Sequence, residues 1–487
     1  MFSQSFGVVF GRWVGKNGCP LVIEPTREAS ISPSKLFAEL DLQVSERLPD
    51  HEPQMVGQDR EIDECLRSAI QAYAARWLPL FAPDSHRLHP SFCDDINTLC
   101  WRKARRDMLK AINRPSYRSV LALYLFGQTP VPLSISSEEE LDGMNGVACS
   151  QTALLHIQQL RQRLRSCQFN GSEVSAWPDS SSHNGVDLGE SLTEAYLNLE
   201  SRAYWASVTW DTSDSMTLNF RSSLSSGLNG ACWEPVWQLA RAFLVGSFRE
   251  QTEEWREKGS RNLETFCPQI VSAASVCTIY TWRTIASLKE ALREGVKEAT
   301  VQSAWSAVLD AIDVFDTTIH PVLSNLGRQL HLLGQVDLLN WYENSLLYYL
   351  GRLILVDALT AAHRDDLLST LRSTNLEAEH ECFNTLKFGL ESRYTIVPDE
   401  EDSIDGIEIC SSARPIVRSF IAIDPYPHHV VAAVRLMHKG FLQEYRDGNV
   451  NQEAYSRLSL TLQQALDQLP QNSKTVQSAR ASLQCPL

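Results

Sequence analysis

Residues 62–78 read IDECLRSAIQAYAARWL, and their pattern decides the fold. Apolar side chains recur every three or four residues from Ile62 to Leu78, which places them on one face of an α-helix. The spacing predicts an amphipathic helix with one buried stripe. The same spacing recurs along most of the chain.

The segments that follow predict two more helices. Ser91 and Asp94 form a helix start, because the serine hydroxyl accepts a hydrogen bond from a free backbone N–H of the first turn. This helix is expected to run to about Ile112. Pro115 suits the first turn of a third helix, residues 115–127, which is apolar all round and must therefore be buried.

The rest of the chain continues the helical pattern. Strand signals are nearly absent, and no fixed repeat supports a regular solenoid. The sequence therefore predicts an all-α protein, a large multi-helix domain around a buried core. Further helices are expected at about 147–167, 191–209, 233–258, 269–293, 297–317, 333–362, 376–392, 426–447 and 452–469.

The non-helical stretches set the expected domain organisation. Residues 1–57 predict an irregular N-terminal segment, and residues 58–397 predict the helical domain, with a turn-rich loop at 168–190. Residues 398–412 contain six acids and predict a solvated acidic loop, although acidic-apolar mixing also occurs in activation segments. Residues 413–487 predict C-terminal helices packed on the same domain.

Charge and composition exclude several classes of protein. The 44 Lys and Arg residues against 59 Asp and Glu residues give a net charge of −15, the opposite of a basic nucleic-acid wrapper. Twelve Cys residues without a Cys-x-x-Cys pair predict reduced, mostly buried thiols. The longest apolar stretch, residues 346–362, contains Arg352 and Asp357, so it predicts a buried helix of a soluble protein and no membrane span.

No complete catalytic or metal-binding motif occurs in the sequence. Gly11 to Asn17 resembles a phosphate-binding loop, but its glycine spacing is one residue short and Asn17 replaces the hydroxyl residue that would hold magnesium. His380 and Glu381 begin a zinc-protease pattern, but Asn384 replaces the second histidine. The sequence therefore predicts no catalytic residue, no cofactor and no metal site, and the chain is not expected to be an enzyme.

A histidine metal site and an acid–base active site both depend on how side chains come together in the fold. His428, His429 and His438 are expected to pack or face solvent, because side chains one residue apart on a helix point about 100° apart and rarely share an ion. Scattered Asp and Glu residues leave a helical metabolic or biosynthetic enzyme as an alternative. Acidic or histidine side chains that converge in one apolar cleft with shifted pKa values would indicate it.

The strongest local charge feature is the basic run Arg102, Lys103, Arg105 and Arg106. Seven basic residues and three acidic ones fall within residues 94–118. The run fits a nuclear-localisation patch or a phosphate-facing strip. A solvated helix face beside buried Leu99, Met108 and Leu109 is the favoured alternative, because short basic runs are common on ordinary helices.

The order of these segments resembles the middle homology region of fungal zinc-cluster transcription factors. Residues 100–109 and 115–127 resemble its basic-apolar helix followed by a proline-started helix that ends in glycine. Residues 200–214 resemble its Arg-x-x-aromatic-Trp helix, and residues 423–432 are similar to the C-terminal part of members that respond to sugars and metabolites. The resemblance spans residues 60–445 and implies an all-helical regulatory domain that senses metabolites or partner proteins.

The DNA-binding head of that family is not matched. The head binds two zinc ions with six cysteines and opens with Cys-x-x-Cys, whereas the first 100 residues here contain only Cys19, Cys65, Cys93 and Cys100. Direct DNA contact is therefore not expected, in agreement with the net charge of −15. The chain would act through partners, or would be the regulatory part of a longer activator.

The resemblance implies a nuclear transcription regulator that controls a metabolic or specialised-metabolite pathway. Its partners would be a small-molecule effector and other transcription regulators or a second copy, and no membrane is involved. A scaffold that heterodimerises with a full-length transcription factor is a further hypothesis. The candidates for a ligand pocket are aromatic, with core packing as the alternative for most of them: Tyr204, Trp205, Trp210, Trp341 and Tyr342.

Overall fold

The computed structural model describes residues 1–15, 18–22, 31–45, 53–81, 90–163, 193–225, 227–228, 233–258, 263–397 and 415–484. The predicted all-α fold is confirmed, because helices form most of the structure and enclose one large apolar core. The loops predicted at 168–190 and 398–412 lie outside the described residues. No helix in the described part of the chain is long and apolar enough to cross a membrane.

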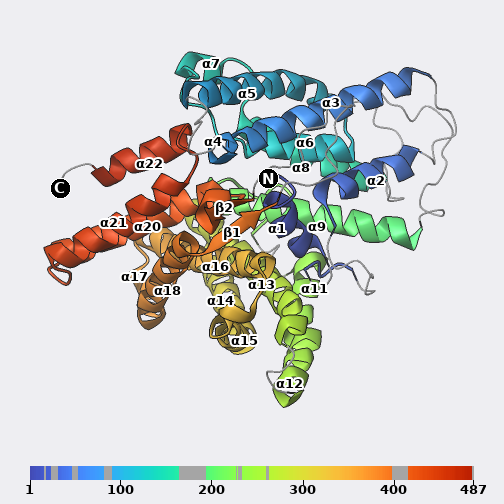
Figure 1. Cartoon of the computed structure of the whole chain (residues 1–487). Coiled ribbons are helices and arrows are strands. Elements are labelled where there is room, and N and C mark those ends of the chain that lie inside the picture. Colours follow the sequence, from blue (N-terminus) through green and yellow to red (C-terminus); the bar gives the residue numbers. More distant parts are fainter. Residues whose placement is uncertain are drawn as a thin grey trace.

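Most of the N-terminal helices form one group, and one long helix passes below that group in the view of Figure 1. In Figure 1, α3, α5, α6, α7 and α8 lie together at the top of the view, and α9 passes below them. The helix predicted over residues 115–127 begins two residues later than expected, as α6, because Ser116 is its N-cap. It packs against α3, α5 and α8 and is buried along most of its length. The helices are α1 (Phe6–Val14), α2 (Pro33–Ser45), α3 (Pro53–Ala75), α4 (Leu78–Phe81), α5 (Pro90–Ile112), α6 (Tyr117–Gly127), α7 (Ser137–Leu141), α8 (Gly146–Arg163) and α9 (Glu194–Thr217).

The C-terminal helices pack around α13 and α16. The hairpin of β1 and β2 is antiparallel, with Arg393 opposite Ser419, and Figure 1 places it near the centre of the view. The elements are α11 (Pro235–Phe243), η2 (Leu244–Phe248), α12 (Arg249–Lys258), α13 (Leu263–Arg293), α14 (Glu298–Val314), η4 (Phe315–Ile319), α15 (His320–Gly327), η5 (Leu330–Leu332), α16 (Gln335–Ala361), α17 (Asp365–Ser369), α18 (Arg372–Glu391), β1 (Arg393–Ile396), β2 (Ile416–Ser419), α19 (Phe420–Ile423), α20 (Pro427–Arg446), α21 (Gln452–Gln468) and α22 (Lys474–Gln484).

The expectation of an irregular segment over residues 1–57 is wrong, because α1, α2 and the start of α3 lie within it. The α1 sequence FGVVFGRWV is rich in glycine and β-branched residues, which are weak helix formers. Burial of its apolar side chains in the core overrides that weak propensity. Ser5 Oγ donates a hydrogen bond to the carbonyl oxygen of Ile423 at 2.5 Å, and Arg12 pairs with Asp337 at 2.7 Å. The N-terminus thus docks on α16 and on the corner between α19 and α20.

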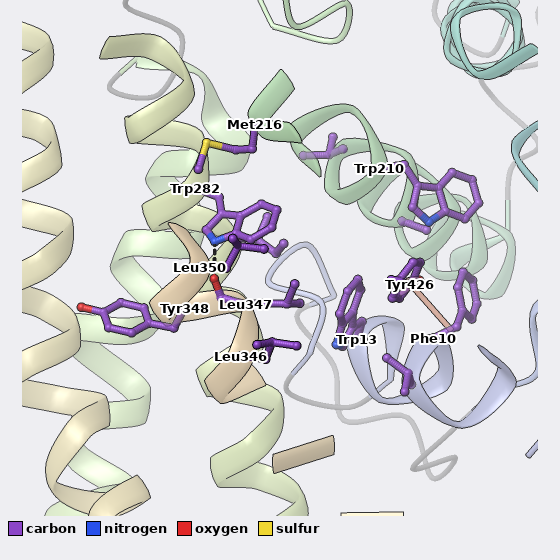
Figure 2. Packing of buried hydrophobic residues seen from close by; sticks show 14 of the residues in the cluster. Phe10, Trp13, Trp210, Met216, Trp282, Leu346, Leu347, Tyr348, Leu350 and Tyr426 are labelled. Carbon is purple, nitrogen blue, oxygen red and sulfur yellow. Dashed lines mark hydrogen bonds between the residues drawn. The ribbon is translucent and has the colours of Figure 1, made fainter. Parts of the chain in front are cut away.

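The helices α13 and α16 approach each other closely at Gly351. Trp282 Nε1 on α13 donates a hydrogen bond to the carbonyl oxygen of Leu347 on α16 at 2.8 Å (Figure 2). A methyl group at Gly351 would lie 2.5 Å from Trp282 Nε1. The edge of the same indole packs against the His429 ring, with centroids 5.4 Å apart. Glycine at position 351 therefore sets the place of Trp282 beside His429.

The variant Gly351→Ala is expected to lower the free energy of unfolding by about 1–3 kcal/mol, because overpacking displaces the indole and strains its neighbours. Gly246→Ala is the matched control, since a methyl group there meets nothing within 4 Å. The control is expected to be neutral or slightly stabilising. Urea unfolding followed by circular dichroism measures both variants, and equal effects would contradict the close approach at Gly351.

Candidate functional site

The most polar part of the core lies where α3, α6, α9 and α16 meet the corner between α19 and α20. Pro425 and Pro427 shape this corner, because proline disfavours a helical conformation of the residue before it and removes a backbone donor. The chain from Asp424 to Tyr426 is therefore not helical, although it is buried. The carbonyl oxygen of Pro425 accepts hydrogen bonds from Tyr73 Oη at 2.6 Å and from Arg76 Nη2 at 2.9 Å.

Two carboxyl groups meet at this corner. Asp424 accepts hydrogen bonds from the backbone N–H of Tyr426 at 2.7 Å and from Tyr342 Oη at 3.3 Å. Glu343 lies beside Asp424, close enough for a hydrogen bond between the two side chains if one of them carries a proton. Among the described residues, neither oxygen of Glu343 has an N–H or hydroxyl donor. Glu343 must therefore be the protonated partner, which donates its proton to the Asp424 carboxylate.

Burial controls the charge of this pair. Burial and the nearby Asp424 charge raise the pKa of Glu343 well above its ordinary value. Burial also raises the pKa of Asp424 to about 6, although the Tyr426 N–H and the positive charge of Arg76 oppose the shift. The two groups titrate as a unit, with one proton shared between them at neutral pH. We define the central cluster as Arg76, Tyr342, Glu343, Asp424 and Tyr426, together with the side chains that contact them and Trp210, which stacks on one of those contacts, Tyr124.

Arg76 supplies the positive charge of the central cluster. Its guanidinium carbon lies 3.8 Å from the centroid of the Tyr73 ring and 4.2 Å from that of Trp77. Only 2% of the Arg76 surface is exposed, and its Nε and Nη1 atoms have no hydrogen-bond partner among the described residues. Aromatic faces and the Asp424 carboxylate therefore provide its compensation.

A second group of titratable side chains joins the central cluster from α9. His429 Nε2 lies 3.0 Å from Ser213 Oγ, and burial lowers the pKa of His429 well below its ordinary value. Burial and the charge of Asp211 raise the pKa of Asp214 to about 7, while a hydrogen bond from Gln128 opposes that shift. His429 is thus held neutral near pH 7, whereas Asp214 changes its charge close to that pH. Protonation of the histidine would place an uncompensated charge in the core.

Aromatic packing connects α1, α6 and α9 to the corner. Trp210 stacks on Tyr124 with ring centroids 3.7 Å apart, and Tyr124 lies beside Tyr426. Trp13 on α1 stacks against Tyr426, with ring centroids 5.6 Å apart. Figure 2 shows Trp210, Tyr426 and Trp13 gathered around α1, away from Trp282.

The structure brings together only some of the aromatic residues predicted to line a pocket. Trp210 and Tyr342 belong to the central cluster through Tyr124 and Asp424. The others pack elsewhere, each against a neighbour of its own. Trp205 lies against Trp237 at 5.9 Å, Tyr204 lies under the Arg161 guanidinium at 3.8 Å, and Trp341 lies against Phe388 at 5.1 Å.

Sequence reasoning missed the charged members of the central cluster, Arg76, Glu343 and Asp424. Each stands in an apolar stretch, and that was the available signal, because an isolated charge on a buried face needs a partner. The partners lie in segments far apart in the sequence, so the signal did not indicate which charges meet.

The basic run is divided between two roles. Arg102 forms a two-pronged ion pair with Glu139, with nitrogen–oxygen distances of 2.6 and 2.8 Å. Arg105 is buried and donates hydrogen bonds to the carbonyl oxygens of Glu139, Glu140 and Met144, so it caps the end of α7. Lys103 and Arg106 are exposed. Two of the four side chains therefore fasten α7 to α5.

The rejected motifs occupy unremarkable positions. Gly11 lies inside α1 and not in a loop, and His380 is exposed on α18. His438 contacts Tyr455 Oη at 3.1 Å, away from His429. Within the described residues, no group of three or more His, Cys, Asp or Glu side chains is arranged to hold a metal ion.

Comparisons of the chain with family models, with curated proteins and with solved structures find no match. The fold and the site define a helical protein with a buried polar centre. The family resemblance stays a prediction, and the function must be argued from the residues themselves.

Proposed function

We propose that the chain is the regulatory domain of a transcription regulator that responds to a small molecule or a partner protein. The supporting observation is that segments which carry the resemblance lie close together in the fold. The resemblance rests on four separate segments, and three of them contribute to the central cluster. Residues 115–127 contribute Tyr124, residues 200–214 contribute Trp210, and residues 423–432 contribute Asp424.

The physical basis of the response is the unusual state of the central cluster. A protonated Glu343 beside an Asp424 carboxylate, with Arg76 only partly hydrogen-bonded, is a buried network that tolerates few arrangements. A ligand or partner that binds one arrangement of the surrounding helices better than another shifts the population toward it. The helices α1, α3, α6, α9 and α16 and the corner that meet here would transmit that shift to the surface.

Because this chain is not expected to contact DNA, the direct test joins it to an unrelated DNA-binding domain. The full chain fused to that domain is expected to change reporter transcription at least about fivefold relative to the domain alone. Glu343→Gln in the central cluster is expected to alter the response. Glu391→Gln, an exposed change on α18, is the matched control and should leave it intact.

An unchanged reporter, with the fusion protein detected in the nucleus by immunoblotting, would overturn the proposal. Co-purification of the chain with a zinc-cluster protein, without any effector-dependent response, would favour the heterodimerising scaffold instead. Reporter transcription and co-purification are both measured in the same cells.

One observation favours a helical enzyme as the second candidate function. Asp214, Glu343, Asp424 and His429 converge with shifted pKa values, as expected of acid–base residues. However, none of the four is more than 3% exposed, so a substrate would reach them only after the helices separate. Turnover needs that opening in every cycle, whereas regulation needs only a shift between arrangements. Loss of a metabolite from a cell extract with the parent protein, but not with Glu343→Gln, would favour the enzyme.

A further inference from the structure

The outer face of α5 is apolar at one end and basic at the other. Leu99, Lys103, Arg106 and Lys110 follow one another at intervals of four, three and four residues, which places them on one side of the helix. Phe92 lies two turns before Leu99 on the same side. We call these five residues the α5 face. Figure 1 shows α5 at the outer edge of the molecule, with α7 at one end.

The large apolar side chains of the α5 face are open to solvent. Leu99 is 65% exposed and Phe92 is 50% exposed, although a helix of this kind normally turns such residues to the core. Leu109, at the side of the face, is 53% exposed, so the prediction that Leu99 and Leu109 are buried is wrong and holds only for Met108. Leu141 on the adjoining α7 is 85% exposed. Exposed apolar side chains gathered on one side of the molecule indicate an interaction surface.

Most of the positive charge of the α5 face has no partner among the residues that the structure describes, because only Lys110 forms an ion pair there, with Asp107 on the same helix. Lys103 and Arg106 form no ion pair within the part of the chain that the structure describes, and Lys110 lies 3.9 Å from Asp107. Arg102 and Arg105 bind to α7 instead, and these contacts hold α7 against α5 next to the α5 face. A basic patch on a chain with a net charge of −15 is a marked local exception.

We propose that the α5 face binds an acidic amphipathic helix of a partner protein. Leucine or aromatic side chains of that helix would cover Leu99 and Phe92, and flanking Glu or Asp residues would pair with Lys103, Arg106 and Lys110. This is the helix-on-surface mode of peptide recognition, in which apolar anchors give affinity and charges select the partner.

The composition of the surface favours a protein over a nucleic acid. Phosphate groups would leave Leu99 and Phe92 uncovered, and Asp94 and Asp95 are exposed on the same helix. The two arginines best suited to phosphate, Arg102 and Arg105, are already used to fasten α7. The surface lies on α5, outside the central cluster, so its role does not depend on the proposed response to a ligand.

The test uses a fluorescent helical peptide of about 18 residues with leucines on one face and glutamates beside them. The full chain is expected to bind it saturably. Lys103→Glu with Arg106→Glu is expected to weaken binding at least tenfold, and Leu99→Ser at least fivefold. Binding should also weaken as the salt concentration rises from about 0.05 to about 0.5 M.

The matched controls change exposed residues of the same types elsewhere. Lys387→Glu with Arg457→Glu, and Leu460→Ser, alter α18 and α21 and should leave the affinity unchanged. A peptide of the same composition in scrambled order should bind at least tenfold more weakly. Circular dichroism verifies that every variant remains folded.

Three results would each overturn the proposal. The first is no saturable binding of the peptide by the folded parent chain. The second is equal weakening by the α5 variants and by the controls. The third is tighter binding of a DNA duplex or of anionic phospholipid vesicles that is lost in Lys103→Glu with Arg106→Glu, which would assign the surface to a different class of partner.

Discussion

Replacement of Asp424 by alanine is expected to lower the free energy of unfolding by about 3–5 kcal/mol at pH 7. The carboxylate accepts hydrogen bonds from the Tyr426 N–H and from Tyr342 Oη, and it is the nearest counter-charge of Arg76 in the central cluster. Without it, the Arg76 guanidinium remains 2% exposed, with two nitrogen atoms that have no hydrogen-bond partner in the part of the chain that the structure describes. Most of the lost stability is expected to come from the Arg76 charge, which stays buried after its partner is removed.

A double-mutant cycle separates the charge from the packing. Asp424→Asn keeps the shape of the side chain but removes the charge, and Arg76→Met removes the guanidinium but keeps much of its apolar stem. The double variant is expected to be more stable than the sum of the single effects predicts, by about 1–3 kcal/mol, because neither charge is then left alone. Chemical denaturation of all four proteins measures this coupling.

Two outcomes would contradict this account of Arg76 and Asp424. Strictly additive effects would show that the two charges do not compensate each other. A loss as large in Asp63→Ala, which removes an exposed partner of Arg118, would show that any acidic residue with an arginine partner has the same effect. Exposed ion pairs contribute only about 0–1 kcal/mol, so a small loss is expected for that variant.

The part of the fold that sequence predicts well has local causes. Residues 62–78 carry a continuous apolar stripe and form most of α3, and residues 115–127 are apolar all round and form the buried α6. A stripe of this kind can be read from neighbouring residues alone. Helix α9 is longer than expected, since it continues to Thr217 with Asp211 and Asp214 buried inside it.

The parts that sequence predicts poorly depend on distant contacts. Helix α1 forms because its weak helix formers are buried, and its contact between Ser5 and Ile423 joins residues 418 positions apart. The central cluster has the same origin, because Arg76, Glu343 and Asp424 come from three segments that only the tertiary fold brings together. Aromatic character alone indicated Trp210 and Tyr342 but gave equal weight to Trp341, which lies elsewhere.

The variant Glu343→Gln is expected to stabilise the protein at pH 8 and to leave it nearly unchanged at pH 5. Glutamine mimics the protonated acid, since it is neutral and its amide can donate to Asp424 as the carboxyl proton does. Burial raises the pKa of Glu343 well above its ordinary value, so the folded protein keeps this proton while the unfolded chain releases it above about pH 4.5.

The sign of the pH effect follows from this proton. Between the unfolded pKa and the folded pKa of Glu343 the native state binds more protons, so the parent loses up to about 1.4 kcal/mol of stability per pH unit as the pH rises. Glu343→Gln removes that loss and is expected to be more stable than the parent by about 2–4 kcal/mol at pH 8. His429, whose pKa is lowered, and Asp214, whose pKa is raised, affect parent and variant alike.

Thermal unfolding of parent and variant between pH 5 and pH 8 measures this difference. Glu391→Gln is the control, because that exposed carboxyl is near Lys387 on the surface and its loss should have the same small effect at both pH values. Parallel curves for the parent and Glu343→Gln would mean that Glu343 is ionised in the folded protein. In that case the shared proton would be absent, and the central cluster would have to be compensated through Arg76 alone.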